Sequence, residues 1–600
     1  MVLGSSDDDE YDDDTIAIHR DDDDDSDDLS YESTESEQFL EKLEFLDMVL
    51  GKIESNDPAL TKLIIHPFFE GYRLLTDNEW ERLGEAIGRS THLQDVFIND
   101  FRGPYRNRFL QILPGFARNR SIQKLKIQHL YLCREVCSFL DQLLANNRVI
   151  ECLHVILCLR EEHNLGLEGG LCALASALRM CHSLKEVEIY TEDAEDDHWF
   201  CVDSVLRSLT GNIGLETLSL FGVSIEDCSA VRTIAMMNIR AIDLGNVLID
   251  DEVATAFADG IACNSTLQEL VFNSAIEFHD NGWQAIIDAL QRSRFRLDKL
   301  SMACNIMPDN RALSLANSLL HHSATLKFLN LSELLSNPDG NDITIVGWRS
   351  LFQLLREPNS VLEELDLGTN LFGDEVVDAL TNALVGNDKL RKLKLSDNLH
   401  VSAAAWAGLS AILRNPKSAL DILDLNEGYI NGDGNLINDD TIFAFADALA
   451  SNRKLTELIL CLNPDLVNYR VTPNGYGALI NSLCNKTSIM STYHSNHTLQ
   501  KICCESVVKL MPNELTYLLN INKFNSQSQA ARLKIIKTHF SGPTINMQPF
   551  GEMDVRVRPH AMAWMAKEYN LYQYLRTMPL LLEKFMNKGK IVLGKRKLDL

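Results

Sequence analysis

One short apolar pattern recurs along most of this chain and limits the folds that it can adopt. The pattern is L-x-x-L-x-L with conservative replacements, as in GLETLSL from Gly214, VLEELDL from Val361 and KLRKLKL from Lys389. It occurs 15 times between Leu60 and Leu499, at a mean spacing of about 31 residues. One such unit cannot bury its apolar side alone, so neighbouring units must stack into a solenoid.

The segments between these patterns indicate helices. Residues 373–387 and 439–452 carry apolar side chains at i, i+3, i+4 and i+7 and open with acidic residues. We therefore predict an α/β solenoid in which parallel strands line a concave wall and helices form the convex one. Asparagines at 370, 398 and 463 follow strands, and we expect their amides to bond the backbone of the turn.

With these repeats the chain resembles the ribonuclease-inhibitor-like leucine-rich-repeat proteins, whose units are long and contain a helix. The resemblance covers roughly residues 57–510 and implies a horseshoe of about 15 repeats. It implies little about function, because the family includes enzyme inhibitors, activators of a nuclear transport GTPase and innate sensors. Ribonuclease inhibitors alternate their repeats regularly and are rich in cysteine, whereas this chain has irregular spacing and modest cysteine content.

Composition divides the chain into four segments. We predict a disordered acidic tail, an N-terminal capping helix, the repeat solenoid and a helical C-terminal cap with a basic tail, at residues 1–37, 38–56, 57–510 and 511–600. The acidic tail holds 17 Asp and Glu residues against one Arg and has almost nothing to bury. Helices in the C-terminal cap are expected at residues 513–524, 528–540 and 560–585.

Several function classes are excluded by composition and by missing motifs. A net charge of −29 argues against a dedicated nucleic-acid binder, because an anionic surface repels phosphate. Neither a secretory signal nor an apolar run long enough to span a membrane is present, and the 14 cysteines are scattered, so we expect a cytoplasmic or nuclear protein. No catalytic signature appears, so we predict no enzyme, cofactor, metal or small-molecule substrate.

One group of residues has the types of side chain that bind zinc. His494 and His497 precede Cys503 and Cys504, but they fall in a segment rich in Ser, Asn and Thr. We interpret the pair as a chance occurrence in a loop.

The concave wall is then the candidate functional surface, and its outward positions can be assigned from the repeats. The candidate protein-binding residues are Ile156, Tyr190, Phe221, Asp243, Asp366, Lys394 and Asp424. Apolar and aromatic residues from three consecutive repeats form one cluster, as binding hot spots often do. The aspartates form an acidic strip that favours a basic partner. An equally open interpretation is that the bulky residues pack on flanking loops.

These observations predict a non-enzymatic scaffold that binds another protein on its concave wall. Two alternatives stay open. One is a regulator of a small GTPase, similar to the leucine-rich GTPase activators. The other is an acidic chaperone of basic proteins acting through residues 1–37.

Overall fold

The structure is a computed structural model of the whole chain. It describes residues 46–66, 72, 74–99, 106–130, 134–157, 167–191, 199–274, 279–334, 343–398, 400–426, 437–460, 471–502 and 511–539. The chain divides into two compact units, Met1–Asn370 and Leu371–Leu600, which are described separately below as unit 1 and unit 2.

Unit 1 contains a parallel sheet whose neighbouring strands come from successive repeats. Its strands, in their order across the sheet, are β1 (Lys62–Ile65), β2 (Asp95–Ile98), β3 (Lys124–Leu130), β4 (Cys152–Leu157), β5 (Glu186–Thr191), β7 (Thr217–Phe221), β9 (Ala241–Gly245), β10 (Glu269–Val271), β11 (Lys299–Ser301), β12 (Phe328–Asn330) and β13 (Glu364–Asp366). Two short strands, β6 (Phe200–Cys201) and β8 (Val223–Ser224), pair separately. The recurring apolar pattern therefore marks the strands, as predicted.

The register of this sheet stacks equivalent residues of successive repeats. The leucine in the middle of each pattern points inward: Leu153, Leu218 and Leu270 are each at most 1% exposed. The residue that follows it points away from the helices, and these residues pair in one row, for example His154 with Glu188. We call the side of the sheet that carries this row the open face.

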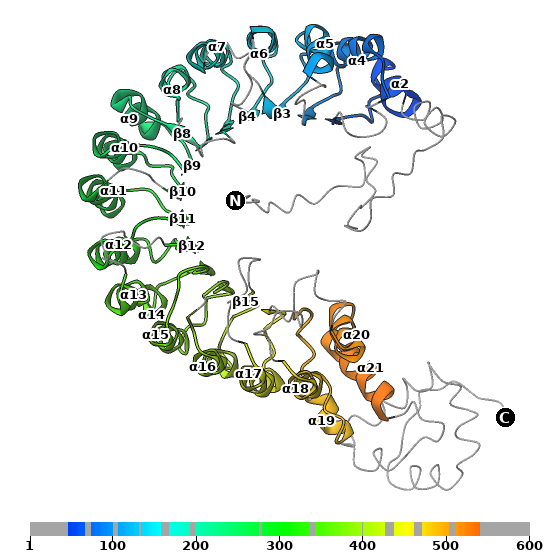
Figure 1. Ribbon diagram of the computed structural model, residues 1–600, viewed down its shortest axis with the longest axis vertical. Helices are drawn as coiled ribbons and strands as arrows, with labels where there is room; N and C mark the ends of the chain where they lie inside the picture. The colour runs from blue at the N-terminus through cyan, green and yellow to red at the C-terminus, as the bar shows by residue number, and fades with distance from the viewer. Residues whose placement is uncertain are drawn as a thin grey trace, which may run out of the picture. The chain divides into compact units, whose positions relative to one another are not determined.

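Helices cover the other side of the sheet in unit 1, and Figure 1 shows them on the outside of the arc with the strands inside. The helical segments are η1 (Leu46–Leu50), α2 (Gly51–Glu54), α4 (Asp77–Arg89), α5 (Arg106–Phe116), α6 (Arg134–Asn146), α7 (Leu167–Met180), α8 (Asp203–Leu209), α9 (Cys228–Met236), α10 (Asp251–Cys263), α11 (Asp280–Arg292), α12 (Asp309–His321), α13 (Ile345–Leu351) and α14 (Gln353–Arg356). Their fully buried Trp80, Trp283 and Trp348 fill the layer between helices and strands.

The turn after each strand repeats one backbone geometry. Ser274, Cys304 and Thr369 each lie three residues beyond the open-face row and have positive φ values of 47°, 57° and 56°. The residue after such a turn is often asparagine: Asn370 Nδ2 donates to the carbonyl oxygens of Leu331 and Leu367 at 2.8 and 3.0 Å. Asn398 also bonds the backbone of its turn, so the prediction for Asn370 and Asn398 is confirmed. Residue 463 lies outside the described residues.

The turn from helix to strand carries a second series of buried asparagines, which the sequence analysis missed. Asn264 Oδ1 accepts the N–H groups of Thr266 and Leu267 at 2.7 and 2.9 Å. Its Nδ2 donates to Met237 O at 2.7 Å, in the preceding repeat. Equivalent bonds are made by Asn119, Asn147, Asn212, Asn452 and Asn496. Each of these side chains closes its own turn and joins it to the repeat before.

Unit 2 continues the same alternation of strands and helices. Its elements are β14 (Lys392–Lys394), β15 (Ile422–Leu425), β16 (Glu457–Leu460), α15 (Asp374–Leu384), α16 (Ala403–Arg414), α17 (Asp439–Ser451), α18 (Pro473–Leu483), α19 (Ile489–Tyr493), α20 (Asn513–Lys523) and α21 (Gln527–His539). Acidic residues open α15 and α17, as predicted. Lys534 on α21 is 1% exposed, and its ammonium donates to the carbonyl oxygens of Leu483 and Asn496, both at 2.8 Å.

The predicted fold class, an α/β leucine-rich-repeat solenoid with a parallel sheet and helices on its other side, is confirmed. Helices α20 and α21 agree with two of the expected C-terminal helices within one or two residues. The acidic tail of residues 1–37 and the expected helix at 560–585 lie outside the described residues. The prediction of a loop around His494 and His497 is wrong in part, because the short helix α19 precedes His494 and is capped by Ser488, whose hydroxyl accepts the N–H of Ser491.

Candidate protein-binding surface

Four consecutive strands of unit 1, β4, β5, β7 and β9, carry most of the candidate residues. On β4 and β5, burial alternates strictly, so Cys152, His154 and Ile156 share the open face. They pair in register with Glu186, Glu188 and Tyr190 on β5. The open face here is therefore a grid of side chains whose positions are fixed by the sheet.

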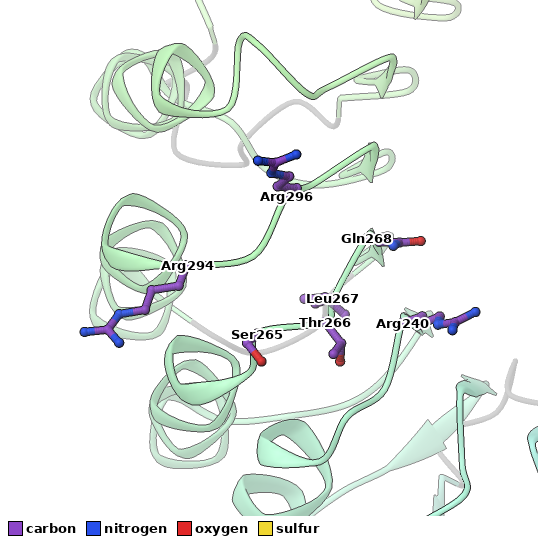
Figure 2. A pocket seen from close by; sticks show the side chains of 7 residues that line it. All are labelled: Arg240, Ser265, Thr266, Leu267, Gln268, Arg294 and Arg296. Carbon is purple, nitrogen blue, oxygen red and sulfur yellow. The ribbon is translucent and has the colours of Figure 1, made fainter.

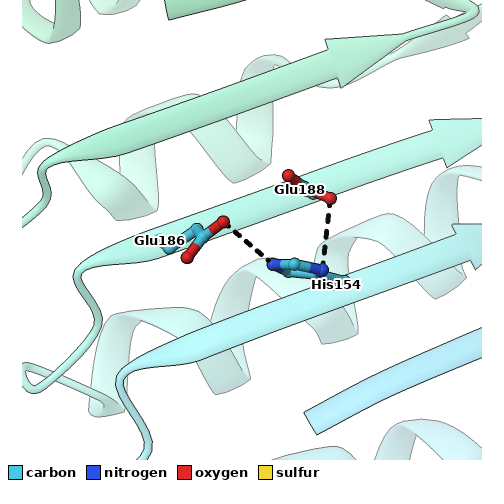
Figure 3. A group of neighbouring side chains, drawn as sticks. All are labelled: His154, Glu186 and Glu188. Atoms are coloured by element: carbon cyan, nitrogen blue, oxygen red, sulfur yellow. Dashed lines mark ion pairs between the residues drawn. The ribbon is translucent and has the colours of Figure 1, made fainter. Parts of the chain in front are cut away.

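On this face His154 lies between the carboxylates of Glu186 and Glu188 (Figure 3). His154 Nε2 is 3.2 Å from Glu186 Oε1, and Nδ1 is 3.2 Å from Glu188 Oε2. The nearby His154 imidazole lowers the pKa of Glu186 to about 2, against the opposing effect of burial. His154 Nε2 is buried, and the Glu186 carboxylate is the group that faces it.

A thiol adjoins this histidine–carboxylate group. Cys152 Sγ lies 3.1 Å from Glu186 Oε2, on the neighbouring strand. Burial, together with the nearby Glu186 carboxylate, raises the pKa of Cys152 to about 12. The thiol is therefore protonated and unreactive in the chain as it stands.

An aromatic pair lies farther along the same strands. The rings of Tyr190 and Phe221 stack with their centroids 5.7 Å apart and an angle of 29° between their planes. The Tyr190 hydroxyl is 3.1 Å from Ser219 Oγ, and Ile156 pairs with Tyr190 in the sheet. The structure thus brings the three predicted apolar residues together on adjacent strands, with Tyr190 and Phe221 each half-buried.

Asp243 lies beside the aromatic pair, on β9. Its carboxylate accepts hydrogen bonds from the Gly245 N–H and from the Ser219 hydroxyl, but burial dominates and raises its pKa to about 6. The side chain is only partly exposed to solvent, and its hydrogen-bond donors are neutral. It would gain free energy from contact with a cationic group.

The other predicted residues are not part of this group. Asp366 is on the open-face row of β13, but it is only 9% exposed and accepts the Gly368 N–H at 3.1 Å. Its exposure was therefore overestimated, because the carboxylate closes the turn that follows its own strand. Lys394 and Asp424 belong to unit 2, where they pair in register on β14 and β15. Since uncharged Val271, Ser301 and Asn330 separate Asp243 from Asp366, these two residues do not form a continuous acidic strip.

The recurring pattern assigns His154 and Glu188 to the open-face row, but it does not predict their contact or the part played by Glu186 and Cys152. The signal was present in the letters CLH and EVE of two successive patterns. When the patterns are aligned, Cys152 falls opposite Glu186 and His154 opposite Glu188.

A cavity of about 370 Å³ lies at the start of β10, where three arginines suggest an anion site. Figure 2 shows that the side chains of Arg240 and Arg294 point to opposite sides, so the guanidinium groups do not converge. Arg240 also pairs with Glu216 at 3.2 Å. We therefore do not interpret this cavity as a phosphate site.

In the part of the chain that the structure describes, no helix combines the length and the hydropathy that crossing a bilayer requires.

Comparison with known proteins finds relatives at low identity. The mouse protein "NACHT, LRR and PYD domains-containing protein 14" is 27% identical over 277 residues, which are 45% of this chain and 25% of that protein. The mouse ribonuclease inhibitor is 23% identical over 359 residues, covering 51% of this chain and 77% of the inhibitor. The chain thus spans only a quarter of the NACHT relative.

No protein-family model matches the chain. Among solved structures, a chain of the yeast Rad7 and Elc1 complex aligns with a TM-score of 0.36 at 15% identity, over 66% of this chain and 90% of that one.

Proposed function

We propose that this chain, a leucine-rich-repeat solenoid similar in sequence to ribonuclease inhibitors, is a non-enzymatic scaffold that binds another protein. The binding surface would be the open face of β4, β5, β7 and β9. A specific interface needs about 800 Å² from each partner, and four adjacent strands with their flanking turns can supply that area.

The observation that carries the proposal is the stacked pair of Tyr190 and Phe221 beside the desolvated carboxylate of Asp243. Rigid aromatic side chains at the centre of a surface are typical anchors of protein interfaces. A partly buried carboxylate next to them favours a cationic side chain on the partner. We therefore expect a partner that presents an apolar side chain flanked by Lys or Arg.

Affinity purification with the full-length chain tests this proposal. Partners captured by the wild type should be lost when Tyr190 and Phe221 are both changed to Ala. The control is Leu313→Ala on α12, which removes an apolar side chain of 43% exposure from the helical side of unit 1. If the double variant captures the same partners as the control, binding at this surface is excluded.

The acidic-chaperone alternative rests on residues 1–37, which hold 17 acidic residues and one Arg. A chain lacking those residues separates the two functions when it is assayed at low and high salt. Polyanion binding is electrostatic, so it should vanish with the deletion and weaken strongly in salt. Binding by the open face should survive both.

A further inference from the structure

The side chains around His154 have the composition and arrangement of a metal site, although the sequence predicted none. Among the described residues, a histidine nitrogen and two carboxylates gather within 4.8 Å of one another at His154, Glu186 and Glu188. The Cys152 thiol joins them through its 3.1 Å contact with Glu186. We propose that His154 Nε2, Glu186 and Cys152 bind one zinc ion on the open face, and that Glu188 orients the imidazole. This inference does not depend on the proposed partner.

The two ring nitrogens of His154 have different surroundings, which is the first argument. Nδ1 faces the Glu188 carboxylate at 3.2 Å and can donate its N–H to it. Nε2 is buried and faces the Glu186 carboxylate at 3.2 Å, so a cation placed between these two groups would be bound by both. Histidines that bind metals nearly always donate their second N–H to a carboxylate or carbonyl, because that bond fixes the tautomer.

The chemistry of the donor atoms selects the ion. Calcium and magnesium prefer sites made only of oxygen atoms. Zinc accepts thiolate sulphur, imidazole nitrogen and carboxylate oxygen in one tetrahedral shell, and water can take the fourth position. Binding would release the Cys152 proton to solvent, because the thiolate is the form that binds metal.

The sheet fixes the donors on two adjacent strands, and Cys152 Sγ, which is not among the ligand atoms that lie within 4.8 Å of one another, must turn towards the imidazole to complete the site. Cys152 and His154 are alternate residues of β4, and Glu186 lies on β5 in register with Cys152. The side chains of His154 and Glu186 are 25% and 33% exposed, so an ion can reach them from solvent. Lys124 on β3 pairs in register with Cys152, and its charge acts on both Cys152 and Glu186, so a cation must bind against this nearby ammonium.

A second group of possible ligands in the described residues makes a useful contrast. Cys201, Asp203 and Glu226 also lie close together. Asp203 Oδ1, however, already accepts the N–H groups of Glu226 and Asp227, both at 3.0 Å. That carboxylate has a structural role at the turn, and the group lacks an imidazole.

Zinc titration of the purified full-length chain after chelator treatment tests the proposal. We expect one zinc ion per chain to bind and to raise the melting temperature. His154→Gln and Glu186→Gln should each lower the affinity by more than about 100-fold, and Glu188→Gln by about 10- to 100-fold. Absence of zinc binding, or equal affinity in His154→Gln, would overturn the site and leave His154 as a partner in ion pairs alone.

Cobalt identifies the sulphur ligand, because a cobalt–thiolate bond gives a charge-transfer band in the near ultraviolet. The band should disappear in Cys152→Ser and persist in the control Cys172→Ser, which removes an exposed thiol on α7. A band that persists in Cys152→Ser assigns the sulphur to another part of the chain and refutes the proposed ligand set. Circular dichroism of each metal-free variant establishes that it is folded.

Discussion

The ring of Phe221 lies against the backbone of Gly245, and a β-carbon at residue 245 would come within 3.0 Å of its Cδ2 atom. The same β-carbon would be 3.3 Å from Asp243 Oδ1. Because these residues pair in the sheet, the absence of a side chain at Gly245 leaves space for the aromatic ring and the carboxylate.

Gly245→Ala should crowd the Phe221 ring and destabilise the protein by about 1 kcal/mol, as overpacking does. The loss should be largely absent when Phe221 is also Leu, since the smaller side chain makes room. Denaturant unfolding of the two single variants and the double variant measures this coupling. Additive losses would show that the ring does not respond to residue 245.

Asp243→Asn should stabilise the protein at pH 7 by about 1–3 kcal/mol. The pKa of Asp243 is raised from 3.8 to about 6, so the folded state binds the proton more tightly than the unfolded state. The ionised carboxylate therefore lowers stability above pH 6, and this penalty disappears as the pH falls through 6 to 3.8. The gain in melting temperature should accordingly be present at pH 7 and absent near pH 3.8.

The matched control for that charge is Glu252→Gln on the exposed first turn of α10, which should show no such pH-dependent gain. The same Asp243 variant should weaken partner binding if a cationic side chain contacts the carboxylate. An Asp243→Asn chain whose gain in stability over the wild type is no larger at pH 7 than at pH 3.8 would contradict this account.

Asn264→Ala should destabilise the protein by about 2–4 kcal/mol, because several buried backbone groups would lose their hydrogen-bond partner. Asn264 bonds two N–H groups of its own turn and carbonyl oxygens of the preceding repeat. Asn415→Ala is the control. Asn415 lies at an exposed turn, where its amide donates to one carbonyl oxygen and accepts one N–H group. Its replacement should therefore lower the free energy of unfolding by less than about 1 kcal/mol. Equal losses, measured by urea unfolding, would exclude burial as the cause.

Lys534 should make the C-terminal helices of unit 2 more stable as the pH rises from 7 to 10. Burial lowers its pKa from 10.5 to about 7, so the unfolded state binds more protons across this range. Hydrogen exchange of the α21 amides, corrected for the intrinsic effect of pH, should show the increase. Lys534→Met should remove it, whereas Lys523→Met, an exposed lysine on α20, should retain it.

His497 adds a second transition to the same region. Burial, with a smaller contribution from Lys534, lowers its pKa from 6.5 to about 4. Stability should therefore fall as the pH drops from 6.5 towards 4, and His497→Gln should abolish that fall. An unchanged acid profile in this variant would assign the transition to other groups.

The strands could be predicted from the sequence because each leucine pattern records which residues a parallel sheet buries. That periodicity also predicts which side chains share the open face, among them Tyr190 and Phe221, whose rings are in contact. The periodicity could not predict which neighbouring group a polar side chain would bond. Asp366 turns back to its own backbone, whereas His154 reaches across to β5, and both carry the same position in the pattern.

The buried asparagines were missed for a related reason. Asn264 precedes its pattern by three residues, as Asn147 precedes its own, but a polar residue beside a turn is ordinarily exposed. Only the neighbouring repeat reveals that its amide is enclosed and donates to Met237 O. The helix α19 was missed because Ser488 and its neighbours have a composition typical of loops, while the cap and the burial of Ile489 come from tertiary packing.

The alternation along β4 and β5 assigns maintenance of the sheet and recognition to different residues. Leu153 and Val187 hold the backbone in register, while Ile156 and Tyr190 meet whatever approaches the open face. A substitution on one side of a strand therefore leaves the other side nearly untouched. Lineages of such a chain can exchange their binding partners over time, one side chain at a time, while the scaffold that presents those side chains is inherited unchanged.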